Sequence, residues 1–266
     1  MKKLLLSSLA GLILTTGSAL AADLYRPAPA YKAPPPPAPA VSWTGCYIDG
    51  GVGYGFWNQE TYGETDPGHV PLTNTFTNGG QGWLGRVGAG CDYQIASSWV
   101  VGVFGDYDFM DLHSKNFADV SGIGSMEKES GAWYVGGRVG YLVTPSLLAY
   151  VDGGYTQTRF DRQELFDTLF SVPAVPIGAF IDAHTYSGWF IGGGTEYALN
   201  MPWIPIRGLF WRTEYRYAQY QAADLPILID TGAPLGVAEH SQKTVQTVTS
   251  GLVWRFNFGG PLAARY

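Results

Sequence analysis

The segment RGLFWRTEYRYAQY, residues 207–220, alternates charged and apolar side chains at every second position. Arg212, Glu214 and Arg216 share one parity, and the other parity carries Leu209, Trp211, Tyr215 and Tyr217. Because successive side chains of a β-strand point to opposite faces, this segment predicts a strand with one charged face and one aromatic face. The fold therefore depends on which solvent each face meets.

The first residues predict export from the cytoplasm. The stretch MKKLLLSSLAGLILTTGSALAAD begins with two lysines, continues as an apolar run and ends with the small-x-small pattern of a signal-peptidase site at residues 19–21. We interpret residues 1–21 as a signal peptide cleaved before Ala22. The alternative is an N-terminal membrane anchor, for which the apolar run is short. No second uninterrupted apolar run of helix-spanning length follows.

The composition favours a chain whose outer surface meets lipid. Charged residues make up 14%, aromatic residues 15%, and glycine occupies 36 of the 266 positions. A soluble globular domain usually carries about 25% charged residues. The net charge of −6 argues against a nucleic-acid partner, because binding to phosphates needs a basic surface.

The chain divides into a proline-rich segment, one substantial domain and a tail. Residues 22–41 include RPAPAYKAPPPPAPA, which is predicted to be an extended or disordered periplasmic segment rather than part of a core. Residues 42–258 are predicted to form the barrel described below, and residues 259–266 a short C-terminal tail.

Eight alternating runs occupy this domain, and their connections alternate in length. The second, fourth and sixth connections are short, whereas the others are long, polar or proline-rich. Outer-membrane barrels have short periplasmic turns and long external loops, with strands long enough to cross the bilayer when tilted. The sequence therefore predicts an all-β, eight-stranded antiparallel up-and-down transmembrane β-barrel. The predicted strands are residues 43–56, 80–94, 99–110, 132–143, 147–160, 186–198, 206–220 and 244–258.

The charged residues of these runs share one parity, and the aromatic and aliphatic residues share the other. A sheet in lipid must close, because an open edge leaves backbone groups unpaired in hydrocarbon. The charged parity is therefore predicted to face the barrel interior as a network of arginines and carboxylates. Its members are Asp49, Arg86, Asp92, Asp106, Asp108, Arg138, Asp152, Glu196, Arg212, Glu214, Arg216 and Arg255.

The predicted interior network uses arginine and not lysine as its cation. Every predicted interior cation is an arginine, whose planar guanidinium suits paired carboxylates in a confined space. The lysines of the mature chain are expected in the tail and loops, at Lys32, Lys115, Lys128 and Lys243. An eight-stranded barrel has an interior just wide enough for its own side chains, so we expect a filled lumen. The alternative is a narrow channel selective for ions or small solutes.

Several glycine- and aromatic-rich motifs occur in a fixed order along the chain. They are WTGCYIDGGVGYG, GWLGRVGAGCDYQ, GGRVGYLVTPSLLAYVDGGY, GWFIGGGTEYAL and TEYRYAQY. Together they resemble the alphaproteobacterial outer-membrane β-barrel family of the Omp25/Omp31 type, a porin-like family with a small OmpA-like barrel. The resemblance covers the whole barrel. It implies an abundant protein in the outer membrane of a Gram-negative bacterium, with a structural and surface role in the cell envelope.

Two features depart from the pattern of this family, and both lie next to the end of a predicted strand. The turn NMPWIP, residues 200–205, is longer and more apolar than usual, and GGPLAARY continues past the last strand. The assembly signal of the last strand is intact at Thr249, Gly251, Trp254 and Phe256. We expect outer-membrane lipid and lipopolysaccharide around the barrel, with peptidoglycan and other envelope proteins as further candidate partners.

The histidines and serines give little support to an enzyme. The four histidines, His69, His113, His184 and His240, are each expected in a different long loop. No two share ligand spacing, so the sequence favours unrelated exposed histidines over a metal or pH-sensing cluster and predicts no metal and no cofactor.

Two short segments, LHS at residues 112–114 and EHS at residues 239–241, contain the residue types of a hydrolase. Both are expected in loops, and nothing in the sequence singles out a nucleophile. No phosphate loop, zinc spacing or dinucleotide fingerprint is present. A lipid-modifying enzyme is therefore less favoured than a structural surface barrel or a narrow porin.

The two cysteines, Cys46 and Cys91, are predicted to form a disulfide between the first and second strands. Export places them in an oxidising compartment, and both share the outward parity of their strands. A hairpin that pairs residue 46 with residue 91 also pairs 48 with 89 and 54 with 83, which matches apolar partners. The alternative is a pair of free thiols that face lipid as small apolar groups.

Overall fold

A computed structural model describes residues 41–114, 117–118, 123–167, 175–199 and 206–256. The predicted signal peptide, nearly all of the proline-rich segment, the turn at residues 200–205 and the C-terminal tail lie outside the described residues. In the described part of the chain, no helix has the length and apolar character needed to cross a membrane.

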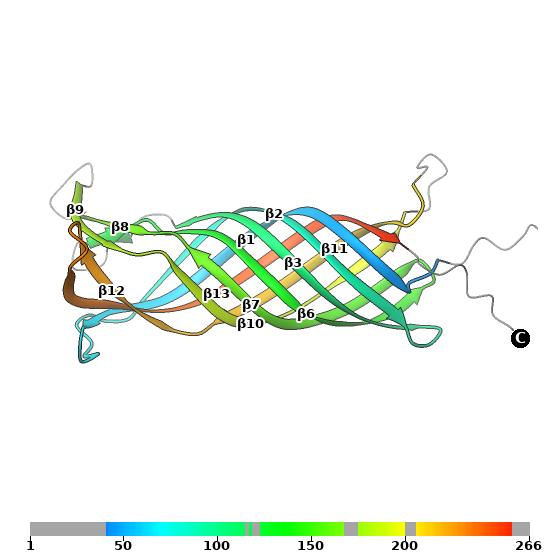
Figure 1. Ribbon diagram of the computed structural model, residues 1–266, viewed down its shortest axis with the longest axis horizontal. Coiled ribbons are helices and arrows are strands. Elements are labelled where there is room, and N and C mark those ends of the chain that lie inside the picture. Colours follow the sequence, from blue (N-terminus) through cyan, green and yellow to red (C-terminus); the bar gives the residue numbers. More distant parts are fainter. Residues whose placement is uncertain (1–40, 115–116, 119–122, 168–174, 200–205, 257–266) are drawn as a thin grey trace, which may run out of the picture. The chain divides into compact units, whose positions relative to one another are not determined.

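Eight long antiparallel strands form a closed ring. They are β1 (Gly45–Thr65), β2 (Phe76–Gln94), β3 (Trp99–Ser114), β6 (Lys128–Thr144), β7 (Leu147–Phe160), β10 (His184–Ala198), β11 (Leu209–Tyr220) and β13 (Pro234–Phe256). Each pairs with its neighbour in this order, and β1 pairs with β13 to close the ring. Figure 1 shows these strands lying side by side at a common tilt. The predicted eight-stranded up-and-down barrel is confirmed.

Side chains alternate between the interior and the exterior along these strands. In β11, Arg212, Glu214 and Arg216 are buried, whereas Trp211 and Tyr215 are exposed. The exposed parity is apolar around the ring. Its large members include Val52, Trp83, Val103, Val135, Val151, Ile191, Trp211 and Leu252. An apolar surface of this extent suits contact with lipid hydrocarbon and not with water.

Inward-facing glycines give room to large interior side chains. A Cβ atom on Gly90 would lie 2.5 Å from the hydroxyl oxygen of Tyr47, and one on Gly102 would overlap a carboxylate oxygen of Asp92. Any larger residue at these two positions would displace a side chain that fills the barrel. The high glycine content therefore follows in part from the crowding of the interior.

The long connections contain further strands, which the sequence did not predict. They are β4 (Phe117–Ala118), β5 (Ile123–Ser125), β8 (Gln163–Asp167), β9 (Val175–Ile181) and β12 (Ala223–Ile229). These strands continue the sheet from β13 in the order β12, β9, β8, β5 and β4. Figure 1 shows β8, β9 and β12 gathered at one end of the barrel. We call this end the external end, because the described parts of the long connections lie there.

The ring strands also extend further towards the external end than predicted. β1 continues to Thr65 instead of ending at residue 56, and β13 begins at Pro234 instead of residue 244. The prediction was wrong here because these extensions mix polar and charged residues on both parities, so they lack the alternation that marks the lipid-facing part. In the structure, pairing between β1 and β13 continues without a break through these extensions as far as Thr65 opposite Val237.

Cys46 and Cys91 form a disulfide between β1 and β2, as predicted. The two residues are direct partners in the antiparallel register, which also pairs Ile48 with Ala89 and Tyr54 with Trp83. The disulfide therefore joins strands that the backbone hydrogen bonds already align.

We predict that the mature protein, denatured without reduction, contains no free thiol. Thiol labelling should give no reaction before reduction and two labelled sites after it. Replacing both cysteines by serine should lower the free energy of unfolding by up to about 4 kcal/mol, because the bond closes a loop that spans 45 residues. Two reactive thiols in the non-reduced chain would contradict the disulfide.

Candidate functional site in the barrel interior and at its external mouth

The interior contains two layers of ion pairs, the first of which is centred on Glu196. Arg255 donates from Nε and Nη2 to Glu196 Oε1 at 2.8 and 2.6 Å. Arg212 Nη2 and Arg138 Nη1 share the other carboxylate oxygen, Oε2, at 3.2 and 3.3 Å. One carboxylate from β10 therefore accepts hydrogen bonds from arginines on three other strands. We call this group the Glu196 layer.

Two aspartates complete the Glu196 layer. Asp92 accepts two hydrogen bonds from Arg138, one of them from Nε at 2.9 Å, and a further one from Arg255 Nη1 at 2.6 Å. Asp49 lies 3.1 Å from Arg212 Nη1. Charge-assisted, forked hydrogen bonds of this kind fix the orientation of both partners.

The second layer, which we call the Arg86 layer, lies towards the external end. Arg86 donates to both oxygens of Asp108 at 2.6 and 2.8 Å and from Nη1 to Glu214 Oε1 at 2.5 Å. Arg216 donates to both oxygens of Asp106 at 2.7 and 2.8 Å. Asp152 approaches Arg216 Nε at 3.3 Å, which is an ion-pair distance without a hydrogen bond.

Aromatic rings fill the space around these guanidinium groups. The Tyr47 ring centre lies 4.8 Å from the guanidinium carbon atoms of both Arg138 and Arg212. The rings of Phe104, Tyr134 and Phe190 surround Arg216 at 5.0, 4.9 and 5.1 Å. These distances allow cation–π attraction, which desolvation strengthens. The rings therefore act both as packing and as further partners for the charges.

The structure brings together all twelve charged residues that the sequence placed in the interior. Ten of them are buried, and only Asp49 and Asp106 are partly exposed. The cavity beside Asp49, Arg86 and Arg212 has a volume of about 10 Å³. A cavity needs about 10–15 Å³ to hold one water molecule, so this cavity is about the size of a single water.

A buried lysine lies beyond these layers, and the sequence analysis missed it. Lys243 was expected in a loop, but it lies in β13 and is fully buried. Its Nζ donates to Gln59 Oε1 at 2.5 Å and to Glu127 Oε1 at 2.6 Å. The expectation was wrong because the predicted strand began at residue 244, immediately after Lys243, whereas β13 begins at Pro234. The inward parity shared with Val245 and Thr247 is the signal that would have placed Lys243 inside.

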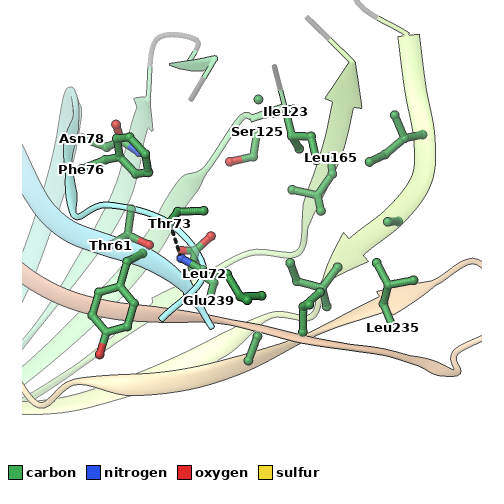
Figure 2. Close-up of a pocket in the computed structure, with 18 residues that line it drawn as sticks. Thr61, Leu72, Thr73, Phe76, Asn78, Ile123, Ser125, Leu165, Leu235 and Glu239 are labelled. Carbon is green, nitrogen blue, oxygen red and sulfur yellow. Dashed lines mark hydrogen bonds between the residues drawn. The ribbon is translucent and has the colours of Figure 1, made fainter. Parts of the chain in front are cut away.

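A pocket opens at the external end, between the end of β1 and the strands of the long connections (Figure 2). Its volume is about 340 Å³, within the range of small-molecule pockets. Leu72, Ile123, Leu165 and Leu235 form part of the apolar wall, and Glu239 is the single carboxylate among the described residues that line the pocket. The wall is drawn from segments far apart in the sequence, so pattern analysis of single runs could not reveal it.

Three of the four histidines do not lie in the long loops where the sequence placed them. Only His69 lies in a connection, whereas His113 is in β3, His184 begins β10 and His240 is in β13. The prediction of four unrelated histidines is also wrong for His69 and His240, because both lie next to Asp224. His240 Nδ1 is 2.5 Å from Asp224 Oδ1, and His69 Nδ1 is 3.6 Å from Asp224 Oδ2.

His69 has a second carboxylate partner, Glu64, whose Oε1 lies 2.6 Å from His69 Nδ1. The hydrogen bond that Glu64 accepts from His69 and the negative charge of Glu64 raise the pKa of His69. The protonated form of His69 is therefore favoured by this contact, and the contact weakens as pH rises through the raised pKa.

Neither serine–histidine pair is arranged as a nucleophile with its base. Both pairs lie in strands and not in the predicted loops, so the two side chains of each pair point to opposite faces. The hydroxyl oxygen of Ser114 accepts a hydrogen bond from the backbone N–H of Glu127, and that of Ser241 accepts one from Tyr186. These partners give both serines a structural role.

We predict that Glu196→Gln lowers the free energy of unfolding by about 3–5 kcal/mol, because three buried arginines lose a shared negative charge. The measurement is urea unfolding of the folded barrel in detergent, followed by tryptophan fluorescence. Glu60→Gln is the matched control, because Glu60 is exposed on β1 and its loss should change stability by no more than about 0.5 kcal/mol. Equal effects of the two substitutions would rule out a special place for Glu196.

Comparison with known proteins agrees with this architecture. The model of the outer membrane protein beta-barrel domain family matches residues 12–256. The 31 kDa outer-membrane immunogenic protein of Brucella melitensis biotype 1 is 29% identical over 229 residues, which are 82% of this chain and 86% of the relative. The protein of the same name from Brucella suis biovar 1 matches with the same identity and coverage.

A solved structure shows the same fold. The outer membrane protein OprG from Pseudomonas aeruginosa aligns over 83% of this chain and 100% of its own, with 14% sequence identity and a TM-score of 0.50. The family match covers the whole ring of strands. The chain therefore belongs to the outer membrane protein beta-barrel domain family, and it is a protein of the outer membrane of a Gram-negative bacterium.

Proposed function

We propose that this protein is a structural and surface-exposed barrel of the cell envelope, whose lumen is filled and closed by an arginine–carboxylate network. The observation that carries the proposal is that every strand of the ring contributes at least one charged side chain to the two ion-pair layers. A pathway for solutes would leave these charges in water, whereas here most of them are buried.

The energetics of the layers fit a closing and stabilising role better than a conducting one. A buried charge is costly unless it is paired and hydrogen-bonded. In both layers the guanidinium groups are shared between two or more carboxylates, so moving one side chain aside to admit a solute would break several contacts at once. Such a network holds the eight strands in one register but offers no low-energy open state.

The external end supplies the surface part of the proposed function. The barrel lies in the outer membrane, where its apolar outer face contacts lipid and lipopolysaccharide. The strands of the long connections extend the sheet beyond that face. The Brucella relatives are outer-membrane immunogenic proteins, which supports exposure of the corresponding segments in this chain. We further propose that residues 22–41 form a periplasmic spacer that reaches other envelope components, including peptidoglycan.

We predict that the purified protein gives little or no steady conductance in planar bilayers, because an eight-stranded barrel leaves no wide aqueous path. Removing one arginine from each layer, in the double variant Arg138→Ala with Arg216→Ala, should produce measurable conductance. Large, reproducible single-channel steps from the unaltered monomer would overturn the proposal and favour a narrow porin.

The matched control for that variant uses the same two strands. Tyr141 and Tyr215 lie on the outer parity of β6 and β11 and are exposed. Their double replacement by alanine removes as many side chains but should leave the conductance at the level of the unaltered protein. Circular dichroism of each variant confirms that the barrel has folded before recording.

A further inference from the structure

We propose that Glu64, His69, Asp224 and His240 form a binding site for one divalent transition-metal cation, for which Zn²⁺ is the probe. The site lies on the outer face of the sheet at the external end, away from the two ion-pair layers. It is independent of the proposed closure of the lumen, because none of its residues belongs to that network.

Strand register places three of the four residues together. Asp224 of β12 is the direct partner of His240 of β13, and Tyr62 of β1 is the partner of His240 on the other side. The rings of Tyr62 and His240 are stacked, with centroids 4.6 Å apart, which fixes the imidazole plane. Glu64 follows Tyr62 by two residues and so shares its face of β1. The ligand atoms of Glu64, Asp224 and His240 all lie within 4.8 Å of one another.

The fourth residue, His69, is brought in by the turn that follows β1. The backbone N–H of His69 donates to the carbonyl oxygen of Thr65 at 2.9 Å, and the N–H of Asp66 donates to the carbonyl oxygen of Gly236 at 3.0 Å. These bonds tie the turn to both β1 and β13. The turn thus holds the His69 ring where Nδ1 reaches Glu64 at 2.6 Å and Asp224 at 3.6 Å.

The spacing of the donor atoms suits a small four-coordinate ion after a modest expansion. Zn²⁺ binds imidazole nitrogen and carboxylate oxygen at about 2.0–2.2 Å, which places neighbouring ligand atoms of a tetrahedron about 3.3–3.6 Å apart. The present separations are 2.5 and 2.6 Å for the two hydrogen-bonded pairs and 3.6 Å between His69 and Asp224. If the ligand atoms of each hydrogen-bonded pair moved apart by about 1 Å, and the proton between each histidine and its carboxylate were lost, the centre would admit an ion of this size.

The net charge of the four residues favours binding of a cation. Within the described residues, Glu64 and Asp224 have only histidines as ion-pair partners, although the Glu64 side chain is only 2% exposed. Asp111 provides a contrast, because it pairs with the ammonium of Lys128 at 2.7 Å as well as with His113. Two carboxylates with two neutral imidazoles carry two negative charges, which one dication would balance. Imidazole ligands favour Zn²⁺ and similar transition metals over Mg²⁺ and Ca²⁺, which prefer oxygen.

The test is a direct measurement of bound zinc. The full mature chain, without a histidine tag and stripped with a chelator, is dialysed against Zn²⁺ at pH 8, which is above the usual pKa of imidazole. We expect about one tightly bound zinc ion per chain, not displaced by an excess of Mg²⁺ or Ca²⁺. Asp224→Asn and His240→Ala should each weaken zinc binding by more than about 100-fold, because loss of an outer partner alone costs about 10–100-fold.

His113→Ala is the matched control, since it removes an exposed histidine beside a carboxylate but outside the proposed site. Its zinc content should equal that of the unaltered protein. A second readout is limited proteolysis of the turn at residues 66–75, which zinc should slow in the unaltered chain and in His113→Ala but not in Asp224→Asn. No stoichiometric zinc in the unaltered protein, or full retention of zinc by the folded Asp224→Asn variant, would overturn the proposal.

Discussion

Pairing between β1 and β13 is the constraint on which the rest of the structure depends. In hydrocarbon an unpaired backbone N–H or C=O group has no water to bind, so a sheet that spans the membrane must have no open edge. The two strands are in register from Cys46 opposite Phe256 to Thr65 opposite Val237. Closure in turn creates an inside and an outside, and the period of two along each strand then assigns every side chain to one of them.

A charged side chain inside so narrow a ring is costly unless it is paired and hydrogen-bonded. The cations of the two layers are all arginines. A guanidinium group can share its donors among carboxylates on different strands, as Arg86 does with Asp108 and Glu214. A lysine offers a point charge on a flexible stem and cannot form the same planar forks. It is consistent that the buried Lys243 lies outside the two arginine layers, among the rings of Trp57, Phe160 and Tyr186.

The sequence predicted the membrane-spanning part well, because there one physical rule acts on every residue. Lipid outside and paired charge inside impose a strict alternation, which identified the ring, its parity and the partnership of Cys46 with Cys91. Past the lipid both faces meet water or other protein, and the alternation fades. For this reason the ends of β1 and β13, the strand β12 and the true place of His240 were not predicted. Their positions depend on pairing between segments that are distant in the sequence.

The arrangement of strands at the external end is therefore determined by different constraints from those that act on the barrel. Its strands add to β13 one after another, so the order of the sheet there is set by contacts between connections and not by membrane closure. Within the described residues this outer sheet ends at the two-residue strand β4, and short edge strands of this kind limit pairing with other chains. The group of His69, His240 and the two carboxylates joins the turn after β1 to β12 and β13 at the point where the ring gives way to this outer sheet. A cation bound there would fasten the surface segments to the barrel without disturbing the ion pairs of the two arginine layers.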